Sequence, residues 1–145
     1  MNAIRVMKCK PNAILPTYGS QMAAGADLYA CLSENLTIAP GESVYVPTGL
    51  AMEIPEGYAG LIYARSGTAC KRDLAPANKV GVIDSDYRGE LIVVLHNHGQ
   101  RVQTVCHGER IAQLVIAPVM TPGFVECNSL TETERSCGGF GSTGN

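Results

Sequence analysis

Residues 111–119 read IAQLVIAPV, the longest of four short runs that are rich in aliphatic and β-branched residues. The other three are SVYVP at 43–47, GLIYA at 60–64 and ELIVVL at 90–95. Runs of this length, bounded by turn residues, predict β-strands. Glycine and proline supply the positive or fixed φ angles that turns need, and they separate the runs at 40–41, 55–57, 97–99 and 122–123.

The spacing of these runs predicts an all-β sandwich or barrel rather than alternating strands and helices. No stretch of eleven or more residues has a clear period of 3.6, so we expect little helix beyond one short segment near Cys70 to Leu74. The 145 residues fit one domain. Composition changes after Val125, where the chain becomes polar and glycine-rich. We therefore expect a single β domain at 1–127 and a flexible, extended arm at 128–145.

Composition excludes several classes of protein. The net charge is -2 and the eleven Lys and Arg residues are scattered, which argues against a nucleic-acid binder. No apolar run approaches the roughly 20 residues needed to span a bilayer. The six cysteines form no CxxC pair, and no signal segment opens the chain. We expect a soluble intracellular protein, cytoplasmic or nuclear, with free thiols.

The C-terminal segment RSCGGFGSTGN at 135–145 contains GFGSTG, which fits the dinucleotide pattern GxGxxG. That pattern needs a strand before it and a helix after it, and neither is predicted here. What remains is a segment with accessible backbone NH groups, two hydroxyls, Arg135 and Phe140. Such a segment can wrap phosphates and stack on a base. The alternative is a terminal tag without a role.

Three upstream segments carry candidate chemistry. Asp84, at the end of the apolar run GVI, is either a general base for water or an ordinary turn carboxylate. ARSG at 64–67 follows a predicted strand and suits an anion, or it is a plain surface turn. Asp27 lies between small residues and suits a hydrated Mg²⁺. In GERIAQ at 108–113 the Glu-Arg pair has a structural interpretation, while Gln113 faces either the core or a ligand.

His96 and His98 would lie on one face of a strand, and Cys106-His107 follows along the chain. A zinc site is therefore conceivable, but no fourth ligand has a suitable spacing. The two histidines flank the turn residues at 97–99, where polar side chains are expected in any case. We expect no zinc site.

Taken together and in this order, five segments resemble the five motifs of the trimeric dUTPases across about 120 of the 145 residues. They are AGADLYA at 24–30, ARSGTA at 64–69, NKVGVIDSDYRGE at 78–90, GERIAQLV at 108–115 and RSCGGFGSTG at 135–144. Two positions depart from the motifs: Ala64 stands where proline is usual, and Ser136 where glycine is usual. These departures affect loop stiffness rather than catalytic side chains.

The resemblance implies a distorted jelly-roll-like β-barrel or sandwich that forms a homotrimer, with the C-terminal arm exchanged between subunits. It implies hydrolysis of dUTP to dUMP and pyrophosphate, with Mg²⁺ as cofactor. This reaction keeps uracil out of DNA and supplies dUMP for dTMP synthesis. No nucleic-acid or membrane partner is implied.

By motif position, Asp84 would activate the water that attacks the α-phosphorus, and Asp27 would hold Mg²⁺ through water. The resemblance also implies two sets of substrate contacts. The phosphate-binding set is Arg65, Ser66, Gly67, Gln113, Arg135, Ser142 and Thr143. The set for uracil and deoxyribose is Asn78, Gly81, Val82, Ile83, Tyr87, Phe140 and Gly141, most of it on a hairpin over 78–87.

Two alternatives stay open. One is a dCTP deaminase, or a bifunctional relative, on the same fold. The other is a non-catalytic trimer that binds nucleotide to regulate a partner protein. The first would need a deaminating acid elsewhere in the chain, and the second would not need Asp84, Asp27 and the arm together.

Overall fold

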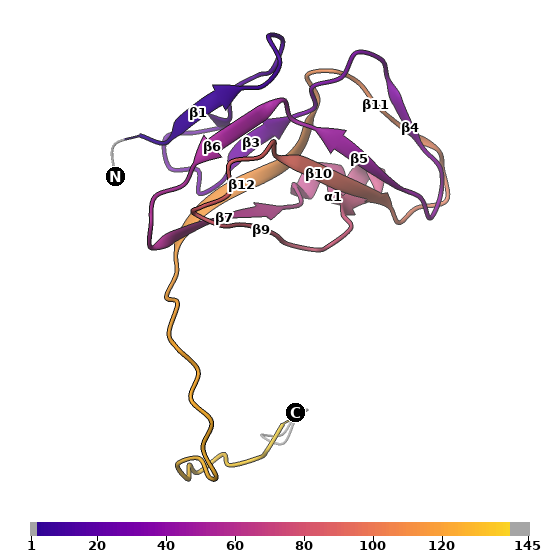
Figure 1. Ribbon diagram of the computed structural model, residues 1–145. Coiled ribbons are helices and arrows are strands. Elements are labelled where there is room, and N and C mark those ends of the chain that lie inside the picture. The colour runs from indigo at the N-terminus through magenta and orange to yellow at the C-terminus, as the bar shows by residue number, and fades with distance from the viewer. Residues whose placement is uncertain (1–2, 140–145) are drawn as a thin grey trace.

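Strand β12 (Arg110–Pro118) is the middle strand of the largest sheet in the computed structural model, which describes residues 3–139 (Figure 1). This five-stranded sheet is antiparallel and has the order β2–β3–β12–β7–β9. Its other strands are β2 (Thr17–Tyr18), β3 (Ala26–Tyr29), β7 (Tyr58–Tyr63) and β9 (Gly81–Ile83).

Three smaller sheets complete the domain, and each is antiparallel. A three-stranded sheet has the order β5–β10–β8, with β5 (Ser43–Pro47), β10 (Ile92–Asn97) and β8 (Leu74–Pro76). Two strand pairs join β1 (Arg5–Lys8) to β6 (Leu50–Glu53) and β4 (Leu36–Ile38) to β11 (Gln103–Val105).

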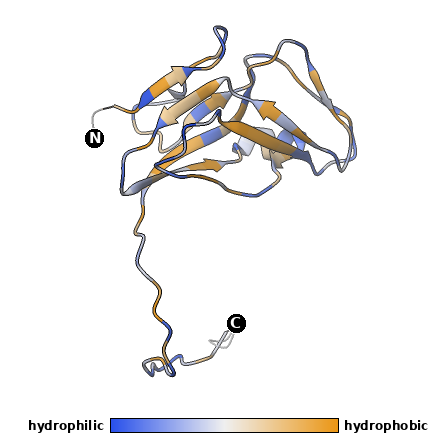
Figure 2. Cartoon of the chain, in the orientation of Figure 1, coloured by the Kyte–Doolittle hydropathy of each residue, from blue (hydrophilic) through white to orange (hydrophobic). Residues whose placement is uncertain are grey.

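The hydrophobic core lies between these sheets. Leu28 and Leu114 from the five-stranded sheet belong to the same buried cluster as Val46, Val93 and Leu95 from the three-stranded sheet. Figure 2 shows hydrophobic residues concentrated along the strands of the domain. Two sheets that bury their inner faces against one another form a β-sandwich, which confirms the predicted fold class.

The four predicted strands are all present: the segment at 43–47 coincides with β5, and the others overlap β7, β10 and β12. The helix prediction was wrong in its bounds. Helix α1 (Ser66–Arg72) begins four residues earlier than predicted, and Asp73 ends it with a left-handed φ of 55°. A helix of seven residues is too short to show a 3.6 period, so its sequence gave no clear signal.

Asn97 is a fully buried polar side chain that ties three chain segments together. Its Nδ2 donates to the carbonyl oxygens of Ile38, at 3.0 Å, and Arg101, at 2.8 Å. Its Oδ1 accepts from the Gly99 backbone NH at 3.0 Å. All three backbone groups lose a hydrogen bond if this side chain is removed.

Asn97→Ala is therefore expected to lower the free energy of unfolding by about 3 kcal/mol, because buried polar groups without partners are costly. Chemical denaturation followed by circular dichroism measures the change. Asn35→Ala, at an exposed position, is the matched control and should leave the midpoint unchanged. Equal midpoints for the two variants would contradict the structural role of Asn97.

After β12, residues 119–139 contain no helix or strand and extend away from the sheets (Figure 1). Their large apolar side chains lie almost fully in the open: Phe124 is 98% exposed and Leu130 is 86% exposed. The expected arm at 128–145 lies partly in this segment. Within the described residues no helix is long and apolar enough to cross a membrane.

Candidate active site

The five-stranded sheet brings together three candidate residues that are far apart in the sequence. Gln113 on β12 is the register partner of Asp27 on β3 and of Tyr63 on β7. Arg65 follows β7 after Ala64, whose carbonyl oxygen accepts from Gln113 Nε2 at 2.8 Å. Asp27, Arg65 and Gln113 therefore form one cluster at the end of β7.

Gly25 has a steric role beside this cluster. A Cβ at this position would lie 2.5 Å from Gln113 Oε1 and 3.2 Å from Gln113 Cβ. Any larger residue would displace the Gln113 side chain. The glycine in the AGAD segment is thus explained by the room that Gln113 needs.

Asp27 is the electrostatic centre of the cluster. Its Oδ1 accepts from Arg65 Nε at 2.5 Å, and its Oδ2 accepts from Arg110 Nη1 at 3.4 Å. The Asp27 side chain is only 12% exposed. A buried carboxylate is costly unless cations satisfy it, and here two do so.

Ser66 and Gly67 are the first residues of α1, and both are exposed. A Cβ at Gly67 would meet no atom within 4 Å. The fold itself therefore does not require glycine at this position. A bare backbone is instead what a ligand needs in order to approach closely.

An open hollow with a volume of about 450 Å³ lies beside Arg65 and Gly67. We call it the arginine hollow, and its lining includes Tyr29, Arg65, Gly67, Arg72, Glu109 and Arg110.

Arg72 and Glu109 fix α1 beside this hollow. Arg72 Nη1 donates to Glu109 Oε2 at 3.1 Å, Arg72 Nε donates to Gln103 Oε1 at 3.3 Å, and Arg72 Nη2 contacts the Thr104 carbonyl oxygen. The two residues of GERIAQ that were given a structural interpretation both form ion pairs: Glu109 pairs with Arg72, and Arg110 pairs with Asp27.

The residues expected to bind the base do not line the arginine hollow. The prediction of a hairpin over 78–87 was wrong, because β9 pairs with β7 and not with a strand of its own segment. Asn78 is exposed just before β9, and Gly81 is buried against Ile62, whose Cβ would lie 3.2 Å from a Cβ at 81. These residues line a small hollow of about 120 Å³, the apolar hollow, together with Pro76, Val82, Ile83 and Ile92.

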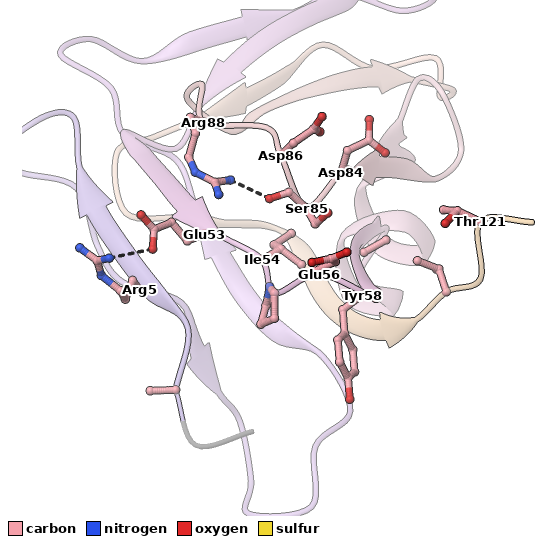
Figure 3. Close-up of a pocket in the computed structure, with 15 residues that line it drawn as sticks. Arg5, Glu53, Ile54, Glu56, Tyr58, Asp84, Ser85, Asp86, Arg88 and Thr121 are labelled. Atoms are coloured by element: carbon pink, nitrogen blue, oxygen red, sulfur yellow. Dashed lines mark hydrogen bonds and ion pairs between the residues drawn. The ribbon is translucent and has the colours of Figure 1, made fainter.

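Asp84 follows β9 and lies in a third hollow, of about 890 Å³. We call it the acidic hollow, and four carboxylates and two arginines line it (Figure 3): Glu53, Glu56, Asp84, Asp86, Arg5 and Arg88. The Arg5 side chain pairs with Glu53 at 3.0 Å, and Arg88 Nη1 donates to the Ser85 carbonyl oxygen at 2.7 Å.

Tyr87 is 44% exposed and folds back along its own segment. Its hydroxyl donates to the Glu90 carbonyl oxygen at 3.1 Å. Its ring lies where a side chain at position 89 would otherwise be, which explains Gly89.

Asp84 and Arg65 lie toward opposite ends of β7. Ile83, the residue before Asp84, is opposite Gly60. Arg65 lies five residues further along than Gly60, which corresponds to roughly 16 Å of extended chain. One chain therefore carries Asp84 and the arginine hollow in separate places.

Of the candidates on the arm, the structure describes only Arg135. It is exposed, and its Nε donates to the Gly138 carbonyl oxygen at 2.9 Å. Phe140, Gly141, Ser142 and Thr143 lie outside the described residues.

The two histidines that raised the question of zinc contact one another, with ring centroids 4.4 Å apart. His96 Nδ1 also lies 2.9 Å from Ser43 Oγ. Between residues 3 and 139, no group of three or more His, Cys, Asp or Glu side chains could hold a metal ion.

Comparisons with known proteins agree with this fold. The family model described as dUTPase matches residues 11–144. The dUTPase of Staphylococcus bacteriophage 80alpha, solved with dUPNHPP, superimposes with a TM-score of 0.91 at 29% identity and full coverage of both chains. A variant dUTPase of phage phi11 of S. aureus, described with a structural Mg(II) ion, gives a TM-score of 0.80 at 27% identity and covers 88% of this chain and 98% of that one.

A relative found by sequence has a higher identity to this chain than these two solved structures have. The deoxyuridine 5'-triphosphate nucleotidohydrolase of Desulfitobacterium hafniense, strain DCB-2, is 53% identical over 131 residues, which cover 90% of this chain and 87% of the relative. The protein thus has the jelly-roll-like all-β fold of these solved enzymes. The chain belongs to the dUTPase family.

Proposed function

We propose that this chain is a dUTP diphosphatase, which hydrolyses dUTP to dUMP and pyrophosphate. Its place in the dUTPase family supports the activity. The observation that carries the proposal for the site is the strand register that gathers Asp27 and Gln113 around the Arg65 segment, with Arg65 itself lining the arginine hollow. The reaction keeps uracil out of DNA and supplies dUMP for dTMP synthesis.

The cluster beside the arginine hollow suits a triphosphate. Among the described residues, Arg65 hydrogen-bonds through Nε only and keeps both terminal nitrogens for oxygen atoms. Gln113 uses one amide hydrogen on Ala64 and keeps a second. Ser66 offers a hydroxyl, and Gly67 offers an unshielded backbone. Hydrolysis at phosphorus depends mainly on positioning and on neutralising charge, and these groups supply both.

Asp84 is the proposed general base. It is exposed, and in the described range no side chain donates to its carboxylate. A carboxylate without a bound cation is free to orient a water and take its proton as the oxygen attacks the α-phosphorus. Asp84 would have the same role in every copy of the chain.

Mg²⁺ is the proposed cofactor, and the residues present fit it. A cage of three protein ligands is absent from the described residues, and Mg²⁺ is usually held by one or two carboxylates, substrate phosphates and water. Asp27 can accept a water of the ion's shell, because a carboxylate has about four acceptor positions and the two arginines occupy only two. When bound, the ion would neutralise charge on the phosphates.

Uracil is proposed to lie against the segment that contains the apolar hollow. Asn78 and backbone groups at Gly81, Val82 and Ile83 would pair with the donors and acceptors of the base. Cytosine would leave buried polar groups unpaired, which discriminates more strongly than a missing methylene does. Tyr87 would pack on the deoxyribose, and Phe140 and Gly141 of the arm would cover the base.

The active unit is proposed to be a homotrimer. The carboxylates beside Asp84 would repel a triphosphate, whereas the arginines lie in a different hollow of the same chain. A neighbouring copy can bring its Asp84 segment against the arginine hollow and so join the two. The arm, whose apolar side chains are exposed on one chain, would close over a site made by the other two chains and supply Arg135, Ser142 and Thr143.

Substrate choice tests this proposal directly. Purified protein with Mg²⁺ should release pyrophosphate from dUTP at least about 100-fold faster than from dCTP, dTTP or UTP, judged by kcat/KM. An enzyme-coupled pyrophosphate assay measures the rates, and excess EDTA should suppress them. Comparable turnover of dCTP, or ammonia release from it, would instead indicate a deaminase, and no turnover of any nucleotide would indicate a binding protein.

A further inference from the structure

Asp27 holds two guanidinium groups that come from distant parts of the chain. Arg65 follows β7 and donates to Asp27 Oδ1, whereas Arg110 begins β12 and donates to Asp27 Oδ2. Two guanidinium groups placed side by side repel one another. A carboxylate between them offsets that repulsion and also fixes where each fork points.

Over residues 3–139, the two arginines use few of their donors. Arg65 contacts Asp27 through Nε alone, and Arg110 contacts it through Nη1 alone, with 54% of the Arg110 side chain exposed. Arg72 is the third arginine that lines the hollow, and its side-chain nitrogens contact Glu109, Gln103 and Thr104. Within the described part of the chain, the arginine donors left for a ligand in the arginine hollow are therefore those of Arg65 and Arg110.

We propose that Arg110 is a further phosphate-binding residue and that Asp27 is a positioning residue that aligns Arg65 and Arg110 on the triphosphate. The inference rests on the proposed function, since it takes the ligand of the arginine hollow to be a polyphosphate chain. The inference adds a contact between Arg110 and the phosphates that does not depend on Mg²⁺. The water-mediated role of Asp27 toward the ion and this positioning role use different acceptor positions of the carboxylate.

The direction in which one substitution changes the affinity for polyphosphate distinguishes this positioning role from simple electrostatic repulsion. Asp27→Asn removes a negative charge from a phosphate site. If Asp27 only repelled phosphate, the variant would bind polyphosphate more tightly. If Asp27 aligns the arginines, the variant binds more weakly although its net charge is more positive.

The experiment is isothermal titration of the full chain with inorganic triphosphate in buffer that contains EDTA. Without a metal ion, a role limited to Mg²⁺ has no effect on binding. We expect Asp27→Asn and Arg110→Gln each to weaken binding about tenfold, the scale of one hydrogen bond to a charged group. Arg110→Lys keeps the charge but loses the fork, so it should fall between Arg110→Gln and the unmodified chain.

Two controls match these charges at exposed positions outside the hollow: Glu34→Gln for Asp27→Asn and Arg101→Gln for Arg110→Gln. Both should bind triphosphate as the unmodified chain does. Thermal unfolding and size-exclusion chromatography show whether each variant is folded. If Asp27→Asn does not fold, the exposed Arg110 variants alone decide the proposal.

Equal or tighter binding by Asp27→Asn would overturn the positioning role, and unchanged binding by Arg110→Gln would overturn the phosphate contact. Failure of the unmodified chain to bind triphosphate would overturn both. These outcomes are distinguishable from failure of the proposed function. A chain that binds triphosphate with the expected variant pattern but leaves dUTP intact would support this inference and refute the diphosphatase.

Discussion

Asp84→Asn should lower kcat for dUTP hydrolysis by roughly 100- to 10,000-fold, the range in which a general base contributes. The amide can still hold a water but takes no proton from it. Binding should persist, because the proposed phosphate contacts lie in the arginine hollow and not beside Asp84. Pyrophosphate release under saturating dUTP measures kcat, and titration with a non-hydrolysable dUTP analogue measures affinity.

Asp86→Asn is the matched control for this variant. Asp86 is an exposed carboxylate two residues away that lines the same acidic hollow. Its replacement removes the same charge and should change kcat less than about threefold, as exposed substitutions usually do. Similar losses in both variants would show that local charge, and not a base at position 84, governs the rate. Full activity of Asp84→Asn would remove this residue from its role.

Deletion of residues 135–145 should lower kcat/KM on the order of 1000-fold, the scale on which loss of an arginine contact acts in phosphoryl-transfer sites. The deletion removes Arg135, Phe140, Ser142 and Thr143 together. The oligomer should persist, since the sheets and their core end at Pro118. Steady-state kinetics and light scattering report the two properties separately. A truncated chain that is monomeric would show instead that the arm has a structural role.

Mixing these two inactive chains tests whether the site is shared between subunits. The Asp84→Asn chain carries an intact arm, and the truncated chain carries an intact Asp84. If each site takes these parts from different subunits, randomly mixed trimers should recover about a quarter of the activity per site. If every part comes from one chain, co-expression should recover none. The mixture thus separates a shared site from a single-chain site without a structure of the complex.

The separation of Asp84 from Arg65 is the reason why this experiment is informative. Both residues flank strands that are hydrogen-bonded to each other, but they lie toward opposite ends. No rearrangement of side chains closes a distance set by the length of a strand. In the proposed homotrimer, a second copy of the chain would close it without any change in the fold.

Local patterns fixed much of what could be predicted. The four apolar runs form strands, because the side-chain pattern and the turn residues that favour a strand lie within a few positions of one another. SVYVP at 43–47 matches β5 at both ends. Helix α1 was misplaced because seven residues give too little periodicity. The hairpin over 78–87 was wrong because the partner of β9 is β7, whose pairing depends on long-range packing that no local pattern contains.

For the candidate site, the order of the motifs indicated the family, the reaction to expect and the residues to consider. The sequence by itself thus determined the chemistry available: one aspartate beyond an apolar strand, an ARSG turn and a glycine-rich arm. Only the tertiary structure decided which charges meet. Asp27 pairs with Arg65 and Arg110 because β3, β7 and β12 are neighbours in one sheet. Ion pairs across a sheet follow from strand order and register, which the whole core sets, and not from the residues adjacent in sequence.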